Sequence, residues 1–247
     1  MNPNCLEDEN IIDIYKKAEI SIQRGKEKIL QSVPNDSIVA IYVKGSYVQR
    51  AMKPGSDVDL IVILKDEEYL PAIYELSEKS KDPDYVPFTV SGYTLDEMRT
   101  GKFASNRTKS PTAISATVKH LDQLLLIYGS KPEGELFIRT DVRDLTALIS
   151  AFEKGFLPDY EDGSFKFGSI VKQVLWLTER EQRALGKMPD YNWQKLADSI
   201  EDKDHIIHMA MKLRKQKEIS KEEKSAFMEK LRDYLIFLKD KYRNTTK

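Results

Sequence analysis

Residues 44–64 read KGSYVQRAMKPGSDVDLIVIL, and the fold of the chain can be worked out from this stretch. An apolar run over residues 38–43 comes directly before it, and a second apolar run, residues 60–64, ends it. Short apolar runs bounded by turn residues are typical of buried strands. Pro54-Gly55 predicts a turn between the two runs. We therefore predict two strands here, with a short helix and a turn between them.

Two aspartates, Asp57 and Asp59, stand where the second strand begins. Side chains alternate between the two faces of a strand, so a strand over residues 57–64 would direct both carboxylates to one side. Their Cβ atoms would then lie roughly 6.5–7 Å apart. Mg²⁺ in nucleotide sites is typically held by one or two carboxylates together with phosphates of the substrate. We predict that Asp57 and Asp59 together bind Mg²⁺.

Gly45 and Ser46, directly after the first strand, suit a phosphate group. Glycine lets the backbone approach a phosphate closely. The N–H groups at the start of a helix favour an anion. Ser46 and Gln49 also fit the capping box of a helix, a structural role that is compatible with phosphate contact. We predict a phosphate-binding turn from which a short helix begins at Ser46.

This combination resembles the DNA polymerase β-like nucleotidyltransferase superfamily, whose pattern is Gly-Ser, a spacer, and then Asp-x-Asp on a strand. The run KPGSD, residues 53–57, is most similar to that of the aminoglycoside adenylyltransferases. The resemblance implies that Asp57 and Asp59 are the catalytic residues. It further implies that the nucleotide is bound by Gly45, Ser46, Lys53 and Ser56. It also implies transfer of a nucleoside monophosphate from a nucleoside triphosphate such as ATP to a hydroxyl of an aminoglycoside-like small molecule.

The superfamily carries a third acidic residue on a later strand, and here that position falls on Thr89. The alignment uses the capped helix start at residues 94–98, TLDEM, which follows that strand. Threonine cannot bind Mg²⁺ as an anion or accept a proton, although activation of a hydroxyl ordinarily needs a positioned base. Four other carboxylates stay open as the base, each with an ordinary reading as a turn, capping or exposed helical residue: Asp84, Glu97, Glu179 and Glu181.

Composition limits the class of protein. The 247 residues include 39 Lys and Arg against 40 Asp and Glu, for a net charge of −1, which argues against a nucleic-acid partner. The single cysteine, Cys5, excludes an internal disulfide and a cysteine-based zinc cluster. No apolar run approaches the length of a membrane span, and the first nine residues are polar and acidic. We expect a cytoplasmic protein without a membrane partner.

The rest of the chain divides into two parts of different character. Helix and strand patterns are mixed up to the polar residues 101–111, and almost only helical patterns follow, starting with residues 113–128. We predict an α+β fold in which a small mixed-sheet nucleotidyltransferase domain, residues 1–108, is followed by an all-helical domain, residues 109–247. A helix is also expected over residues 67–80, between the second strand and the third.

The sequence therefore predicts an Mg²⁺-dependent nucleotidyltransferase. Its partners would be a nucleoside triphosphate and a small-molecule hydroxyl acceptor, and a homodimer stays open. Two alternatives remain beside it. One is the same chemistry on a protein or a tRNA, as in toxin–antitoxin nucleotidyltransferases. The other is a nucleotide-binding module with weak or no transfer, because Thr89 replaces the expected carboxylate.

Overall fold

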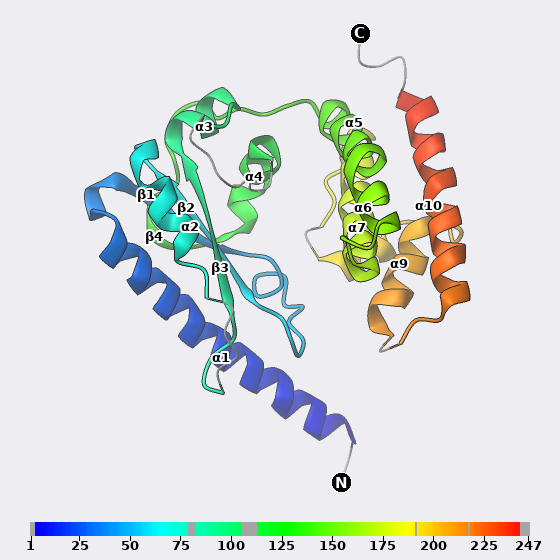
Figure 1. Cartoon of the computed structure of the whole chain (residues 1–247), viewed down its shortest axis with the longest axis horizontal. Coiled ribbons are helices and arrows are strands. Elements are labelled where there is room, and N and C mark those ends of the chain that lie inside the picture. The colour runs from blue at the N-terminus through cyan, green and yellow to red at the C-terminus, as the bar shows by residue number, and fades with distance from the viewer. Residues whose placement is uncertain (1–2, 79–82, 105–112, 191, 217, 243–247) are drawn as a thin grey trace. The chain divides into compact units, whose positions relative to one another are not determined.

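A computed structural model describes residues 3–78, 83–104, 113–190, 192–216 and 218–242 (Figure 1). The chain forms two compact units, Met1–Ile138 and Arg139–Lys247. The boundary predicted after residue 108 lies outside the described residues. The units divide later than that boundary, because a strand that follows it joins the sheet of the first unit.

The first unit is built on a mixed four-stranded sheet with the strand order β3-β2-β1-β4. Its strands are β1 (Ile38–Lys44), β2 (Val58–Leu64), β3 (Phe88–Thr94) and β4 (Leu125–Gly129). β1 pairs antiparallel with β2 and with β4, whereas β2 and β3 are parallel. The predicted mixed sheet is therefore confirmed, and the predicted strand over residues 57–64 begins one residue later, at Val58.

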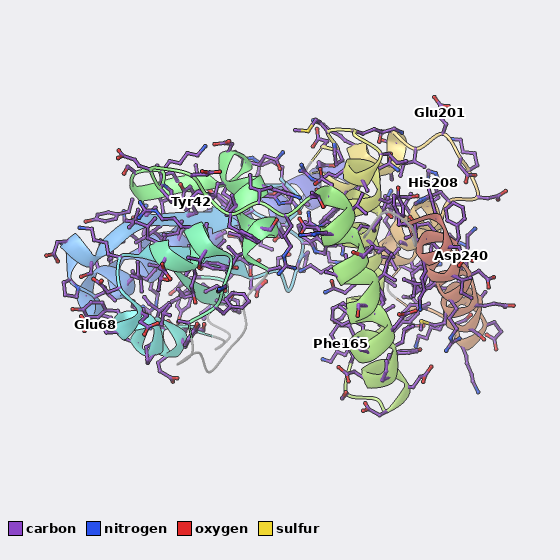
Figure 2. All side chains as sticks on the ribbon, turned by 90° about the horizontal axis from the view of Figure 1, so that it is seen from above. Tyr42, Glu68, Phe165, Glu201, His208 and Asp240 are labelled. Carbon is purple, nitrogen blue, oxygen red and sulfur yellow. The ribbon has the colours of Figure 1, made fainter. Side chains whose placement is uncertain are left out.

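Alternation along the central strands creates two separate cores. Val58, Leu60 and Val62 of β2 point into one core, which is covered by α1 (Pro3–Ser32) and α2 (Leu70–Glu75). Ile61 and Ile63 point into the other core, where α3 (Leu95–Thr100) and α4 (Ile114–His120) pack. Figure 1 shows α1 and the α3–α4 pair around the strands, and Figure 2 shows Tyr42 inside this unit and Glu68 on its surface. Both faces of the sheet are therefore buried, which explains why β1 and β2 read as continuous apolar runs.

Three helix predictions differ from the structure. Residues 45–50 form hydrogen-bonded turns and no helix. Within the described residues, the helix predicted over residues 67–80 is confined to a 3-10 turn, η2 (Glu67–Tyr69), and α2, and residues 79–80 lie outside them. The helix predicted over residues 113–128 is α4, then the 3-10 turn η3 (Leu121–Gln123) and β4, since the edge of β1 offers backbone partners to this apolar run. One further 3-10 turn, η1 (Asn35–Ser37), precedes β1.

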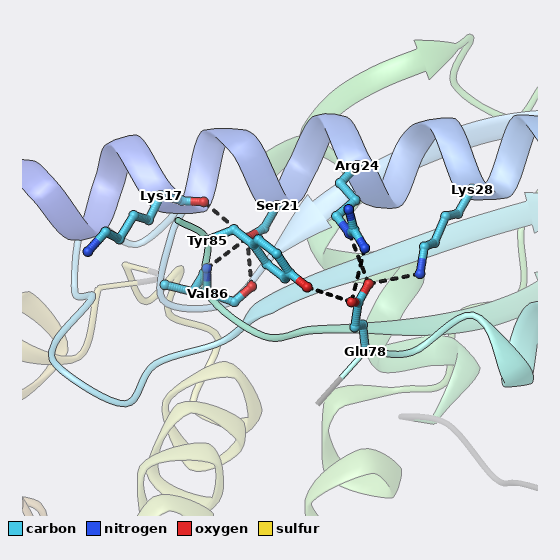
Figure 3. A network of polar contacts seen from close by, with 7 residues as sticks. All are labelled: Lys17, Ser21, Arg24, Lys28, Glu78, Tyr85 and Val86. Atoms are coloured by element: carbon cyan, nitrogen blue, oxygen red, sulfur yellow. Dashed lines mark hydrogen bonds and ion pairs between the residues drawn. The ribbon is translucent and has the colours of Figure 1, made fainter. Parts of the chain in front are cut away.

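A polar cluster attaches α1 to the segment before β3 (Figure 3). Arg24 and Lys28 of α1 both bind the carboxylate of Glu78, and the hydroxyl of Tyr85 donates to it at 2.6 Å. These partners lower the pKa of Glu78 to about 2, with the Arg24 hydrogen bond as the main cause. Ser21 exchanges two hydrogen bonds with the backbone of Val86. The cluster fixes the long helix against the start of the strand that carries Thr89.

In the second unit, all regular elements that the structure describes are helices, in agreement with the all-helical prediction. They are α5 (Asp141–Ala151), the π-helical turn η4 (Phe152–Phe156), α6 (Leu157–Glu161), α7 (Phe167–Ala184), α8 (Trp193–Asp198), α9 (Ile206–Lys215) and α10 (Lys221–Tyr242). One apolar core joins α5, α7, α9 and α10. Among the described residues of the chain, none of the helices combines the length and the apolar character needed to cross a bilayer.

Candidate functional site

The predicted site lies where three strands of the first unit come side by side. In the sheet register, Lys44 at the end of β1 is opposite Asp59 of β2, and Asp59 is level with Thr89 of β3. Since residues two apart share a face, these three side chains lie on the face of Ile61 and Ile63. The position that the alignment assigned to the third acid is therefore beside the second aspartate.

The carboxylate of Asp59 lies between β3 and the turn that follows β1. The hydroxyl of Thr89 donates a hydrogen bond to Asp59 Oδ1 at 3.1 Å. On the other side, a Cβ atom placed on Gly45 would come within 2.5 Å of Asp59 Oδ2. Asp59 itself is half-buried. Glycine at position 45 is thus required by the close approach of this carboxylate, and by a backbone φ of +76°.

The turn after β1 differs from the helix that was predicted there. Gly45 and Arg50 both have positive φ values, and Ala51 N–H donates to Ser46 O, a span too long for a regular helix. In the described part of the chain, the N–H groups of residues 46–48 donate to no backbone carbonyl. Successive free N–H groups next to a left-handed residue form a concave anion site. The turn can therefore still receive a phosphate, without a helix.

α1 holds this turn in place. The ring of Tyr15 packs 5.6 Å from the ring of Tyr47, and the Arg50 guanidinium lies 5.5 Å from the Tyr15 ring centre. The N–H of Met52 donates to the Tyr15 hydroxyl at 3.2 Å. Burial, followed by the neighbouring Glu19, raises the pKa of Tyr47, which keeps its hydroxyl protonated. The loop between β1 and β2 is thus supported by aromatic contacts.

The second half of the loop is a tight turn. Ser56 Oγ accepts a hydrogen bond from Lys53 N–H, and Ser56 N–H donates to Lys53 O. The turn that these two bonds close places Gly55 at a φ of +86°, a backbone conformation that favours glycine at this position. Lys53 and Asp57 are both exposed, and Asp57 directly precedes β2. The residues predicted to bind the nucleotide and Mg²⁺ therefore lie at the two ends of the loop between β1 and β2, and Asp59 lies just inside β2.

Glu97 is not placed as a base beside Asp59. Glu97 is buried and completes the capping box of α3, with Thr94 N–H donating to Oε2 and Ala104 N–H donating to Oε1. Thr94 is level with Leu64, at the opposite end of β2 from Asp59. Asp84 is exposed on the segment before β3.

Glu179 and Glu181 were expected as exposed helical residues, and this expectation is wrong. Both are buried in the C-terminal part of α7, with 1% and 4% of their surface exposed. Glu179 binds the guanidinium groups of Arg180 and Arg183. Both glutamates therefore have structural partners within the second unit. The periodicity of α7 did not indicate this burial, because charged residues on a helix usually face solvent.

Glu181 is bound by the neighbouring helices. Its Oε2 accepts hydrogen bonds from the Tyr234 hydroxyl of α10 and from Nε2 of His205, the residue that caps α9. Burial opposes ionisation of Glu181, but the bonds from His205 and Tyr234 outweigh it and lower the pKa of Glu181. The charged form of this carboxylate therefore joins α7, α9 and α10.

The donor set around β2 fits Mg²⁺ in its chemistry. Asp57 and Asp59 supply the hard oxygen ligands that Mg²⁺ prefers, and one or two carboxylates suffice when phosphates complete the shell. The described residues contain no group of three or more acidic, histidine or cysteine side chains that could hold a metal without a substrate. Phosphates of the nucleotide and water would therefore supply the remaining ligands of an Mg²⁺ ion held here.

Comparisons with known proteins agree with this site. Residues 24–107 match the family model described as the nucleotidyltransferase domain, and this range includes all the predicted site residues. A search of curated proteins found no match.

Among solved structures, the chain is similar to spectinomycin adenyltransferase AAD(9) from Enterococcus faecialis, crystallised with ATP and spectinomycin. The TM-score is 0.57 at 15% sequence identity, over 92% of this chain and 100% of that one. At this identity, the likeness concerns the fold.

Proposed function

We propose that this chain, in which residues 24–107 form a nucleotidyltransferase domain, moves a nucleoside monophosphate from a nucleoside triphosphate to a hydroxyl of a small molecule. The family model confirms the predicted nucleotidyltransferase. Pyrophosphate would leave, and Mg²⁺ would be required. The observation that carries the proposal is the Asp59 carboxylate at the edge of the Gly45 turn, inside the matched domain.

Each residue of the loop has a separate task in this proposal. Asp57 and Asp59 would bind Mg²⁺ through their carboxylate oxygens. When bound, Mg²⁺ neutralises charge on the phosphates and orients the phosphorus that is attacked. The N–H groups after Gly45 and the hydroxyl of Ser46 would hold phosphate oxygens. Lys53 would add a positive charge on the exposed side, while Ser56 would keep the turn closed.

The acceptor is proposed from the structural neighbour. That protein was crystallised with ATP and spectinomycin, and its fold extends over both units of this chain. We therefore propose ATP as the nucleotide and an aminoglycoside-like antibiotic as the acceptor.

The experiment is to measure pyrophosphate release from Mg²⁺-ATP with spectinomycin and a panel of aminoglycosides. Asp57→Asn and Asp59→Asn should each abolish release. Asp66→Asn is the matched control, since Asp66 is exposed just beyond the far end of β2 and should leave release unchanged. Release that persists in both site variants would contradict the proposal.

A second candidate function follows from Thr89. In this candidate, the chain binds the nucleotide but transfers it slowly or not at all. The observation that favours it is the Thr89 hydroxyl beside Asp59, at a position where a carboxylate would serve as the base. General-base assistance is typically worth about 10²–10⁴-fold in rate. For this candidate, Thr89→Glu should raise the rate of transfer. The wild type should already bind the nucleotide with the affinity usual for an active nucleotidyltransferase. If the wild type transfers rapidly and Thr89→Glu lowers the rate, the first proposal, a fully active nucleotidyltransferase, is favoured.

A further inference from the structure

Thr89 contacts the proposed metal ligand directly and lacks a charge of its own. Its hydroxyl donates to Asp59 Oδ1 at 3.1 Å, and the two residues are level in the parallel register of β2 and β3. Thr89 is half-buried. There are two readings of the Thr89 hydroxyl: it merely occupies the place of a lost carboxylate, or it orients the side chain of Asp59.

The contacts of Asp59 favour the second reading. The terminal torsion of an aspartate is soft, so an unsupported carboxylate rotates over a broad range. Here the Thr89 hydroxyl holds Oδ1, and Oδ2 lies in the space that a Cβ atom on residue 45 would occupy. The hydrogen bond to Oδ1 therefore restricts rotation of the carboxylate before any cation arrives. A ligand that is already oriented loses less conformational entropy on binding.

We infer that Thr89 is a positioning residue, whose hydroxyl orients the Asp59 carboxylate for the Mg²⁺ that accompanies the nucleotide. The inference rests on the proposed function, because it needs Asp59 to be a metal ligand. Hydrogen-bond partners of metal ligands typically contribute 10–100-fold to metal affinity. Thr89 acts through Asp59, to which its hydroxyl donates, and receives no proton.

The test is the Mg²⁺ dependence of nucleotide binding in the full chain. Binding of a fluorescent ATP analogue is measured across a Mg²⁺ titration, and with EDTA. Thr89→Val keeps the shape of the side chain and removes the donor. It should raise the Mg²⁺ concentration for half-maximal binding by about tenfold or more. Binding in EDTA should stay at the wild-type value, a split that a general loss of structure would not produce.

Two further variants make the test specific. Thr89→Ser retains the hydroxyl and should restore the wild-type Mg²⁺ dependence. Ser91→Ala removes a hydroxyl from the same strand and the same face, but Ser91 is level with Ile61, so this variant should bind as the wild type does. If Thr89→Val loses its helical circular dichroism, Thr89→Ala removes the same donor with a smaller side chain.

The outcomes separate this inference from the proposed function. Wild-type Mg²⁺ dependence in Thr89→Val, or an equal loss in Thr89→Ser, would overturn the role of the hydroxyl while leaving the proposed function standing. A wild-type chain that shows no Mg²⁺-dependent nucleotide binding would overturn the proposed function itself.

Discussion

At the scale of single residues, Gly45 has the strictest environment in the site. Its φ of +76° belongs to the left-handed region, and its missing Cβ leaves room for an oxygen of Asp59. Gly55, in the same loop, has a φ of +86° but no atom within 4 Å of its own Cβ position. A comparison of substitutions at the two glycines therefore distinguishes the effect of backbone strain from the effect of a clash with the Asp59 carboxylate.

We predict that Gly45→Ala weakens Mg²⁺-dependent nucleotide binding more than Gly55→Ala does. Both substitutions place a side chain in the left-handed region, at a cost of about 1–2 kcal/mol in the free energy of unfolding. Only alanine at 45 also displaces the Asp59 carboxylate. Urea unfolding and calorimetric titration with Mg²⁺-ATP check the two effects. Equal nucleotide affinity in the two variants would show that the contact is unimportant.

At the scale of elements, the Glu78 cluster joins α1 to the start of β3 (Figure 3). The pKa of Glu78 is lowered to about 2, so its charged form stabilises the folded state. This stabilisation is present above the pKa of the unfolded chain, near 4.5, and is lost as the pH falls toward 2.

We therefore predict that Glu78→Gln lowers the free energy of unfolding at pH 7 by about 1–2 kcal/mol, after allowance for solvent around Arg24 and Lys28. The difference from the wild type should shrink between pH 4.5 and the folded pKa of about 2. Urea unfolding at a series of pH values measures it. Glu75→Gln, at an exposed position of α2, is the control and should change little. A difference that is independent of pH would contradict the ionic role of Glu78.

The second unit offers a comparable test on α7. Glu181 accepts hydrogen bonds from Tyr234 of α10 and from His205 at the start of α9. Hydrogen bonds to a charged group contribute about 1.5–3 kcal/mol each. Glu181→Gln should thus destabilise the chain by about 2 kcal/mol, measured by thermal unfolding. Glu229→Gln, exposed on α10, should leave the melting temperature unchanged. If Glu181→Gln does not lower the melting temperature, the carboxylate does not stabilise the contacts between these helices.

At the scale of the whole molecule, each unit has cores drawn from its own residues. The core of the second unit contains buried residues from Leu145 to Tyr242 only. The core on the Ile61 face of the first unit includes Ile114 and Leu121, which follow the boundary that was predicted after residue 108. Removal of these residues would expose that face of the sheet.

We predict that residues 1–138 form a cooperatively folded fragment and that residues 1–108 do not. The shorter fragment lacks α4 and β4, so Tyr42 and Ile61 lose their cover. Circular dichroism and urea unfolding of the two fragments decide between the boundaries. A sharp transition in residues 1–108 would place the first domain where the sequence predicted it.

The local parts of the fold were predictable from the sequence. Strands β1 and β2 follow from apolar runs bounded by Gly45 and by the Pro54-Gly55 turn, because turn chemistry and strand periodicity act over a few residues. The capping box of α3, Thr94 with Glu97, was identified in the same way and is present. The positions of Asp57 and Asp59 at the start of β2 needed only these local signals, whereas their roles also rest on the resemblance to nucleotidyltransferases.

Other features depend on partners that are distant in the chain. Residues 125–129 form a strand because β1 has a free edge, a condition that no local pattern encodes. The hydroxyl of Thr89 meets Asp59 through the register of β2 and β3, and Glu181 is buried because His205 and Tyr234 satisfy it. The sequence by itself thus determined strands β1 and β2, the capping box of α3 and the acidic motif. Tertiary structure decided which polar groups meet, because hydrogen bonds between distant residues exist only once strands and helices have packed.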